Sequence, residues 1–408
     1  MDRDTSTSAG AASARRGRDR LAVEHLPRPR PASPDGSRRP TLAALFDPRD
    51  NSLDVLRLAL AGFVAVVHGT ANGFGRQPHV GTTDLGSVAV DGFFVVSGFL
   101  VTRSFLRLGS LRRYAWHRFL RIAPAFWVCL VVTAAAVAPL AAVLGGQSAA
   151  VVLEGPDSAP SYVSSNALLL MRQFGVTGVG DPVRGGQAVL DGSLWTLFFE
   201  ACCYGAVAAL GVVGVLRRRA WLLAACAVLW AATIAAAAGV DLGTELMLRF
   251  LFIFLLGAAG YVFADRVPVS GALAAASTAL VVAGLHLLPD HRALAGPAFA
   301  YVVLWAAVRL PLRWRPRWDL SYGLYIYHWP VQLLLALAGA AVLGAVPFVA
   351  LSLLLACAAA ALSWLLVERP CLRMKDASWV QAPLPRRRRG AGGSPGTGRG
   401  DRPHEESR

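Results

Sequence analysis

The sequence carries little charge and lacks the patterns that mark a metal site or a cleaved leader. Of its 408 residues 16% are charged and 55% are hydrophobic, and the mean hydropathy is +0.49. Soluble domains carry about 25% charged residues, so this composition indicates an integral membrane protein. There is no CxxC pair and no cluster of His and Cys, so we expect no metal site. No apolar core precedes a cleavage site near the N-terminus, so we expect no cleaved signal peptide.

Cysteines are few and are placed poorly for disulfides. All six lie within apolar segments or just after the last one: Cys129, Cys202, Cys203, Cys226, Cys357 and Cys371. None falls in a loop predicted to face an oxidising compartment. We therefore interpret them as small core residues.

Long apolar runs dominate the chain and predict an all-α integral membrane protein with about ten transmembrane helices. The candidate spans have the approximate limits 52–72, 86–105, 122–144, 194–215, 220–239, 247–264, 269–288, 296–310, 320–338 and 342–367. Residues 48–375 form the predicted transmembrane domain. Residues 1–47 and 376–408 are basic and rich in Pro, Ser or Gly, so we expect two disordered tails.

The arginines predict the orientation of the chain. With a cytoplasmic N-terminal tail, fourteen arginines of loops and span ends fall inside and four fall outside. This bias predicts a multi-pass protein of the cell membrane, inner or plasma, with both termini in the cytoplasm. The net charge of +15 lies in the tails and inner loops, so we expect the lipid bilayer and no nucleic acid as a partner.

Two connections differ from the others. Residues 106–121 are basic with interleaved Leu, Tyr, Trp and Phe, which predicts a helix lying on the inner membrane surface. The longest outer connection, at about 145–193, has the length of a lid or of a loop that faces an acceptor, although such loops are also often merely mobile.

An arginine and a histidine share one face of the first span. Arg57 and His68 are eleven residues apart, which is about three turns plus 20° and about 16 Å along a helix. Ionisable groups at such depth normally face a protein interior or a wet cavity and serve function. The alternative is an interfacial arginine with a histidine satisfied by a neighbouring helix.

Two carboxylates fall at the predicted depth of His68. His68 lies about 24 Å from the inner face, while Asp91 and Glu200 lie about 7 and 9 Å below the outer face of a core roughly 30 Å thick. A carboxylate beside an imidazole fixes its tautomer and raises its basicity. We predict His68, Asp91 and Glu200 as catalytic residues, with a structural polar network as the alternative, and leave open which carboxylate contacts His68.

Arginines gather near the inner face. Arg118 and Arg121 are one helical turn apart, Arg112 and Arg113 are close by, and Arg57 lies above them. Guanidinium groups grip phosphate oxygens bidentately. The alternative is a topological role, because basic residues are expected at this face.

The ninth and tenth spans add further candidates. Tyr322, Tyr325 and His328 follow at i, i+3 and i+6 before Pro330, which marks a kink. The tyrosines are also typical of packing or of an aromatic belt, and we retain His328 as a site candidate. Glu368 follows the last span, and pairing with the arginines at 309–317 is the interpretation we favour.

Six motifs follow one another along the chain: Arg57-x10-His68, Val90–Thr102, Arg118-x-x-Arg121 to Pro124, Ser193-Leu-Trp195 through Glu200 to Tyr204, Leu320–Pro330 and Glu368-Arg-Pro370. Together they resemble the motifs of the membrane acyltransferase-3 family, the O-acetyl and O-acyl transferases of lipopolysaccharide, peptidoglycan, exopolysaccharides and some macrolides. The resemblance covers about residues 50–375, with Gly92 and residues 201–203 as the departures.

The resemblance implies transfer of an acyl group, with acetyl expected, from cytoplasmic acyl-CoA to a hydroxyl of a carbohydrate or a glycosylated small molecule. Acyl-CoA is then a co-substrate, and we expect no bound cofactor. His68 corresponds to the family's essential histidine. We assign Arg57, Arg118, Arg121 and Ser97 to donor binding, and keep as further candidates Trp195, Tyr204, Tyr325, His328 and Glu368. The alternative function is a transporter or flippase with an intramembrane His/carboxylate proton relay.

Overall fold

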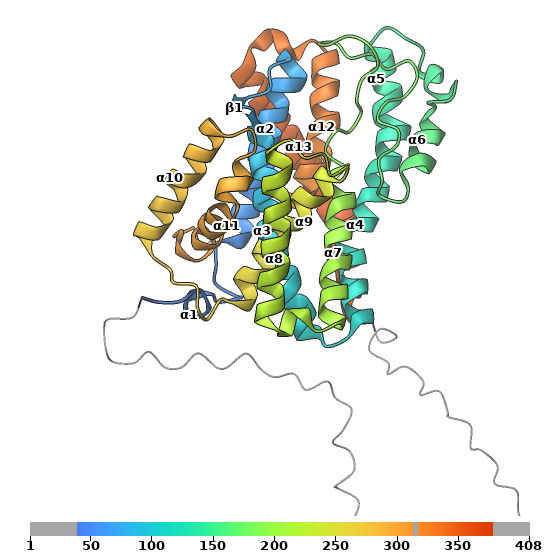
Figure 1. Cartoon of the computed structure of the whole chain (residues 1–408). Coiled ribbons are helices and arrows are strands. Elements are labelled where there is room, and N and C mark those ends of the chain that lie inside the picture. Colours follow the sequence, from blue (N-terminus) through green and yellow to red (C-terminus); the bar gives the residue numbers. More distant parts are fainter. Residues whose placement is uncertain (1–38, 313–316, 378–408) are drawn as a thin grey trace, which may run out of the picture.

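The structure is a computed structural model that describes residues 39–312 and 317–377 (Figure 1). It is an all-α bundle, and each of the ten predicted spans contains a helix. The main helices are α2 (Leu53–Phe74), α3 (Leu85–Leu108), α4 (Leu111–Val132), α7 (Thr196–Val212), α8 (Arg219–Ala237), α9 (Glu245–Val262), α10 (Gly271–Leu287), α11 (His291–Arg309), α12 (Ser321–Leu337) and α13 (Ala345–Ser363).

Short elements extend or connect these helices. The π-helical turn η1 (Thr133–Val137) joins α4 to α5 (Ala138–Leu144), and η5 (Trp364–Glu368) joins α13 to α14 (Arg369–Arg373). The sole sheet of the described residues is the hairpin of β1 (His79–Val80) and β2 (Thr83–Asp84). The remaining elements are α1 (Leu42–Leu45), η2 (Ala149–Leu153), α6 (Ala159–Asn166), η3 (Val215–Arg217), η4 (Ala340–Leu343) and η6 (Met374–Asp376).

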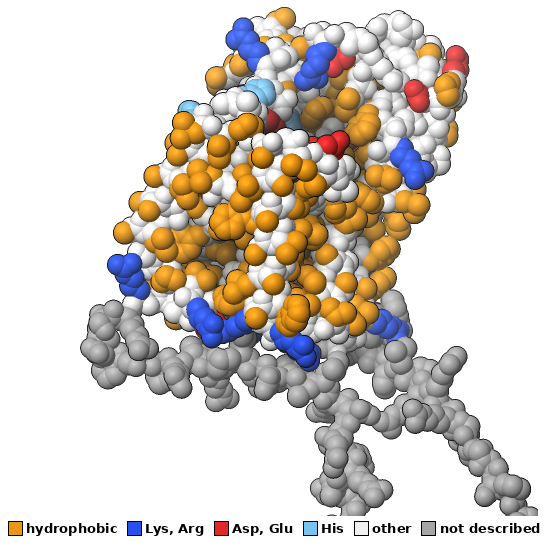
Figure 2. All heavy atoms as spheres, viewed as in Figure 1, with side chains coloured by type: hydrophobic (Ala, Val, Ile, Leu, Met, Phe, Trp, Pro, Cys, Tyr) orange, Lys and Arg blue, Asp and Glu red, His pale blue; other side chains and the backbone are white. Residues whose placement is uncertain are grey.

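The composition of the helices fits a membrane-spanning bundle. Seven helical segments of the described chain are long and apolar enough to cross a bilayer, and the apolar helices α7 and α10 are slightly shorter. Hydrophobic side chains cover the middle of the molecule, and basic side chains lie at its edges, most of them along the lower one (Figure 2). We call the end with α1, η3 and η6 the tail end, and the end with β1, β2 and α6 the loop end (Figure 1).

Helix α3 lies in the core of the bundle and packs against α9, α2 and α7. Two glycines bring its backbone against α9, because a Cβ at Gly98 would overlap the carbonyl oxygen of Phe254, and one at Gly257 would overlap that of Val95. Small residues of this kind let membrane helices approach closely. The close contact fixes the position of the helix that carries Asp91 and Ser97.

Two sequence predictions about the tail end are wrong. Residues 39–47 belong to the fold, since the Leu42 and Ala43 amides donate to the carbonyls of Val267 and Ala264. Residues 106–121 form no separate surface helix, because α3 continues to Leu108 and α4 runs on through Pro124 into the bundle. The inward face of α4 buries apolar side chains along its length, which outweighs the tendency of its arginines to stay at the surface. The rest of the predicted tails, residues 1–38 and 378–408, lies outside the described residues.

The long connection between α5 and α7 is folded rather than extended. It contains η2 and α6, and the buried Asn166 side chain binds three backbone groups, the carbonyl of Gln173 and the amides of Arg172 and Gln173. The segment therefore forms an ordered cap at the loop end, beside α4 and α5. Whether it acts as a lid stays a prediction.

Candidate active site

A pair of histidines joins α2 to α12 inside the bundle. Nδ1 of His68 lies 2.8 Å from Nε2 of His328, and the two rings are stacked with centroids 5.1 Å apart. The edge of Trp329 closes the pair, with its centroid 4.8 Å from that of His68. His328 is completely buried, whereas His68 is partly exposed.

The hydrogen bonds define which nitrogen of each ring carries the proton. Nδ1 of His328 lies 3.1 Å from the carbonyl oxygen of Leu324, which can only accept, so this nitrogen carries hydrogen. In a neutral imidazole the other nitrogen, Nε2, is then an acceptor and receives the Nδ1–H of His68. The free nitrogen of His68 is therefore Nε2 with a lone pair, the form that a general base requires. Within the described chain this Nε2 has no hydrogen-bond partner.

His68 lies on the protein-facing side of α2. The exposed residues Phe63 and Val66 are 44% and 37% accessible and lie on the opposite side of the helix, about 140° and 160° from His68 at 100° per residue. The ring thus turns away from the face that lipid would cover. This arrangement confirms that Arg57 and His68 share the interior face of α2.

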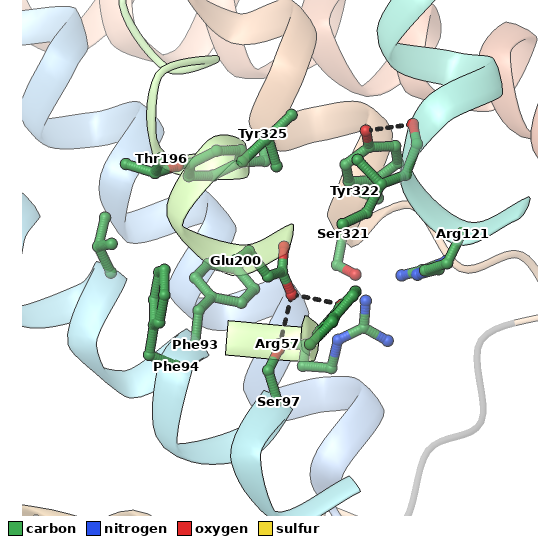
Figure 3. A pocket seen from close by; sticks show the side chains of 14 residues that line it. Arg57, Phe93, Phe94, Ser97, Arg121, Thr196, Glu200, Ser321, Tyr322 and Tyr325 are labelled. Carbon is green, nitrogen blue, oxygen red and sulfur yellow. Dashed lines mark hydrogen bonds between the residues drawn. The ribbon is translucent and has the colours of Figure 1, made fainter. Parts of the chain in front are cut away.

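A cavity of about 60 Å³ opens among α2, α3, α4, α7 and α12 on the tail-end side of the histidines. This volume would hold about four water molecules. Arg57, Arg121 and Ser321 line one side of it and Phe93 and Phe94 the other, with Glu200 between them (Figure 3). The apolar part is lined by Val90, Phe93, Phe94 and Leu197, and the upper end by Thr196 and Tyr325. Neither His68 nor His328 is among the described lining residues.

The two lining arginines share a counter-ion that the sequence prediction missed. Asp319 lies 3.2 Å from Arg57 and 3.0 Å from Arg121. Burial alone would raise the pKa of Asp319, but the two guanidinium groups outweigh it and hold the pKa well below its usual range. The signal was an acidic residue just before the Ser321-Tyr322 motif, in a short connection at the arginine-rich end.

Glu368 also belongs to this tail-end cluster. It is buried, accepts a hydrogen bond from Ser363, and lies 3.7 Å from Arg121. The interpretation that favoured the arginines at 309–317 as its partners is therefore wrong for the described residues, because the packing of η5 against α4 brings Arg121 closer. Arg313 and Arg315 lie outside the described residues.

Glu200 lies on the wall of the cavity, and its described hydrogen bonds do not include His68. One carboxylate oxygen accepts from Ser97 at 2.9 Å and from Tyr204 at 2.7 Å, which joins α3 to α7 (Figure 3). The guanidinium of Arg118 lies over the Tyr204 ring, 5.5 Å from its centroid, outside the cavity lining. Arg118 and Arg121 therefore do not act on one space in this structure, as a common phosphate site would require.

Asp91 does not contact His68 either, since its described partners are two arginines. It is completely buried and lies 3.0 Å from Arg249 and 2.7 Å from Arg292. His291 is 3.9 Å from the same carboxylate. The prediction of a carboxylate beside His68 is thus wrong. Residue counting gives a depth along each helix, whereas the side toward which the residue points depends on packing.

Trp195 is a packing residue at the start of α7. Its ring lies 5.7 Å from those of both Phe199 and Phe250, and it does not line the cavity. A second, smaller pocket of about 10 Å³ lies beside Trp329 at the loop end and is lined in part by Asn72, Asp181 and Arg184. It belongs to the same side of the histidine pair as α6 and the hairpin.

Comparison with known proteins assigns the family. No curated protein and no solved structure matches the chain. The family model for the acyltransferase domain of the acyltransferase-3 type matches residues 50–368, which is most of the sequence and includes the histidine pair, the cavity and both arginine clusters. The chain therefore belongs to the acyltransferase-3 family.

Proposed function

We propose that this acyltransferase moves an acyl group, most simply acetyl, from acyl-CoA to a hydroxyl of a carbohydrate or a glycosylated small molecule. In this proposal the tail end faces the cytoplasm, with both chain termini, and the loop end faces the acceptor across the cell membrane. The observation that carries it is the histidine pair between a cavity on one side and a pocket on the other.

The donor would enter from the tail end. Arg57 and Arg121 line the polar mouth of the cavity, where their guanidinium groups suit the phosphates of the CoA nucleotide. The apolar wall above them suits the uncharged arm and the acyl group. Asp319 pairs with both arginines, so phosphate has to compete with it or share its partners.

The acceptor would meet His68 from the loop end. Nε2 of His68 takes the proton of the acceptor hydroxyl while the oxygen attacks the thioester carbon, and the imidazolium then protonates the leaving thiolate. His328 holds the tautomer through Leu324 and shares the developing positive charge. General-base help of this kind contributes about 10²–10⁴-fold.

The test is the variant His68→Ala in purified protein with labelled acetyl-CoA. We expect acceptor-dependent release of CoA to fall by about 10²–10⁴-fold, because only the base is lost. His286→Ala is the matched control, since His286 is an exposed histidine of α10. Thermal unfolding measurements establish that both variants are folded. Wild-type turnover in a folded His68→Ala variant would remove His68 from the proposal.

The acceptor is found by comparing cells with and without the gene. Mass spectrometry of cell-surface glycans and secreted metabolites should show an acetyl mass that disappears in the deletion strain and returns with the wild-type gene but not with His68→Ala. A deletion strain whose glycans and metabolites keep every acyl group contradicts the proposed acceptor class. Membership in an acyltransferase family favours acyl transfer over the transporter alternative.

A further inference from the structure

The upper end of the cavity closes at a pair of hydroxyl groups. Oγ1 of Thr196, on α7, lies 2.7 Å from the hydroxyl of Tyr325, on α12. Both side chains are buried, and both line the cavity (Figure 3). This contact is the last polar feature that a donor entering from the tail end would meet.

The direction of this hydrogen bond follows from the neighbouring one. Oγ1 of Thr196 also lies 3.2 Å from the carbonyl oxygen of Ser193, which can only accept. The single hydroxyl hydrogen of Thr196 is used there, so Thr196 accepts from Tyr325. The phenol of Tyr325 is therefore a donor that points across the top of the cavity and is held by an acceptor that a substrate carbonyl can replace.

Tyr325 also lies beside the histidine that pairs with the proposed base. Its ring lies 6.1 Å from that of His328, which is hydrogen-bonded to His68. The apolar Phe93 packs against the other side of the phenol ring, with centroids 5.7 Å apart. An apolar neighbour of this kind lowers the local dielectric constant, which strengthens a hydrogen bond to developing negative charge.

We propose that Tyr325 is a catalytic residue whose hydroxyl donates a hydrogen bond to the carbonyl oxygen of the donor thioester. This inference rests on the proposed function. As the acceptor oxygen bonds to the carbonyl carbon and its proton passes to His68, the carbonyl electron pair becomes an oxyanion that Tyr325 stabilises. Collapse of the intermediate breaks the C–S bond, and the thiolate takes the proton from His68.

The proposal separates Tyr325 from Thr196, although the two form one hydrogen bond. Tyr325→Phe removes the donor and keeps the ring, so we expect kcat to fall by about 10²–10³-fold with the KM for acetyl-CoA nearly unchanged. Thr196→Val removes only the resting acceptor and frees the Tyr325 hydroxyl. We expect its loss of kcat to be at least about tenfold smaller than that of Tyr325→Phe, since Thr196 donates no hydrogen bond to the carbonyl.

If the Tyr325–Thr196 contact is only structural, kcat falls equally in Tyr325→Phe and Thr196→Val, and that result would overturn the proposal. An unchanged kcat in Tyr325→Phe would also overturn it. Replacement of Tyr325 by 3-fluorotyrosine keeps the hydroxyl and the packing and makes the phenol a stronger hydrogen-bond donor. If Tyr325→Phe fails to fold, a kcat insensitive to this replacement overturns the proposal in its place.

The His68→Ala result distinguishes the two proposals. Loss of turnover in His68→Ala together with normal turnover in Tyr325→Phe leaves the proposed function in place and removes the role of Tyr325. Retained turnover in His68→Ala removes the proposed function itself, whatever Tyr325→Phe does.

Discussion

Two charge clusters, each with an aspartate between two arginines, lie at opposite ends of the bundle. At the loop end Asp91 lies between Arg249 and Arg292, and at the tail end Asp319 lies between Arg57 and Arg121. The side chain of Asp91 is 0% exposed, whereas that of Asp319 is 28% exposed. The arginines of the tail-end cluster line the cavity, and those of the loop-end cluster do not.

The difference shows what separates a structural ion cluster from a binding one in an apolar protein. In both clusters a carboxylate neutralises part of a dense positive charge, which burial would otherwise make costly. Whether the cluster can also bind an anion depends on whether a cavity lies next to it. A cluster sealed among α3, α9 and α11 can only hold helices together, while one that borders a cavity can also bind an anion.

The largest effect is expected from breaking the sealed cluster. Asp91→Asn leaves two buried guanidinium groups without their shared charge, so we expect the free energy of unfolding to fall by about 3–5 kcal/mol. Thermal unfolding of the purified protein in detergent measures it. Asp290→Asn is the matched control, because Asp290 also pairs with Arg292 but is 30% exposed and asparagine keeps the helix cap. Equal unfolding temperatures for the two variants would contradict the structural role.

The cluster at the cavity should respond in donor binding rather than in stability. Arg121→Ala removes a cation from the cavity mouth, so we expect the KM for acetyl-CoA to rise about tenfold, since a charge-assisted hydrogen bond to phosphate contributes about 1.5 kcal/mol or more. The unfolding temperature should change little compared with Asp91→Asn. Steady-state kinetics over a range of acetyl-CoA concentrations measure the effect.

Two further variants sharpen this result. Asp319→Asn removes the competitor of phosphate, so the KM should move downward, opposite to Arg121→Ala. Arg369→Ala, an exposed arginine of α14, should leave the KM unchanged. If the KM rises equally in Arg121→Ala and Arg369→Ala, the cavity arginines do not bind the donor specifically, and they serve only to orient the chain in the membrane.

The helices were predictable from the sequence, because hydropathy marks each apolar segment. The lateral neighbours were not. Residue counting placed Asp91 and Glu200 at the predicted depth of His68, yet packing turns them toward Arg249 and toward Tyr204. The partner of His68 is His328, 260 residues away. Hydropathy contains no information on which of ten helices lie side by side.

Asp319 was missed for a related reason. It lies in a short polar connection, 262 residues from Arg57, and a single acidic residue there gives no periodic signal. The resemblance to the family did identify the segments that meet at the site, because its motifs include Arg57, His68, Arg121, Tyr325 and His328. It did not predict that a hydroxyl pair closes the cavity below the histidines.

Another buried carboxylate gives the smallest expected effect. Asp191, before α7, is completely buried and accepts hydrogen bonds from Ser193 and Cys129, with no guanidinium partner among the described residues. Burial raises the pKa of Asp191 to about 7, against the opposing hydrogen bonds. The folded state thus favours the protonated form, and stability falls as pH rises from about 4 to about 7.

This dependence is measurable as an unfolding temperature roughly 2–4 °C lower at pH 7 than at pH 5. Asp191→Asn should flatten the profile over this range, since asparagine does not ionise. If the unfolding temperature of Asp191→Asn depends on pH as that of the wild type does, another group causes the dependence. The contrast with Asp319, whose guanidinium partners lower its pKa, would then be lost.

The position of His68 beyond the Tyr325–Thr196 contact has a consequence for the hydrolysis of the donor by water. A thioester that waits in the cavity is separated from the imidazole that would activate a nucleophile. In the proposed reaction, water that follows the donor in from the tail end meets the carboxylate of Glu200, which is engaged by Ser97 and Tyr204, but not the imidazole of His68. Hydrolysis of acyl-CoA would then stay slow until an acceptor arrives from the other side.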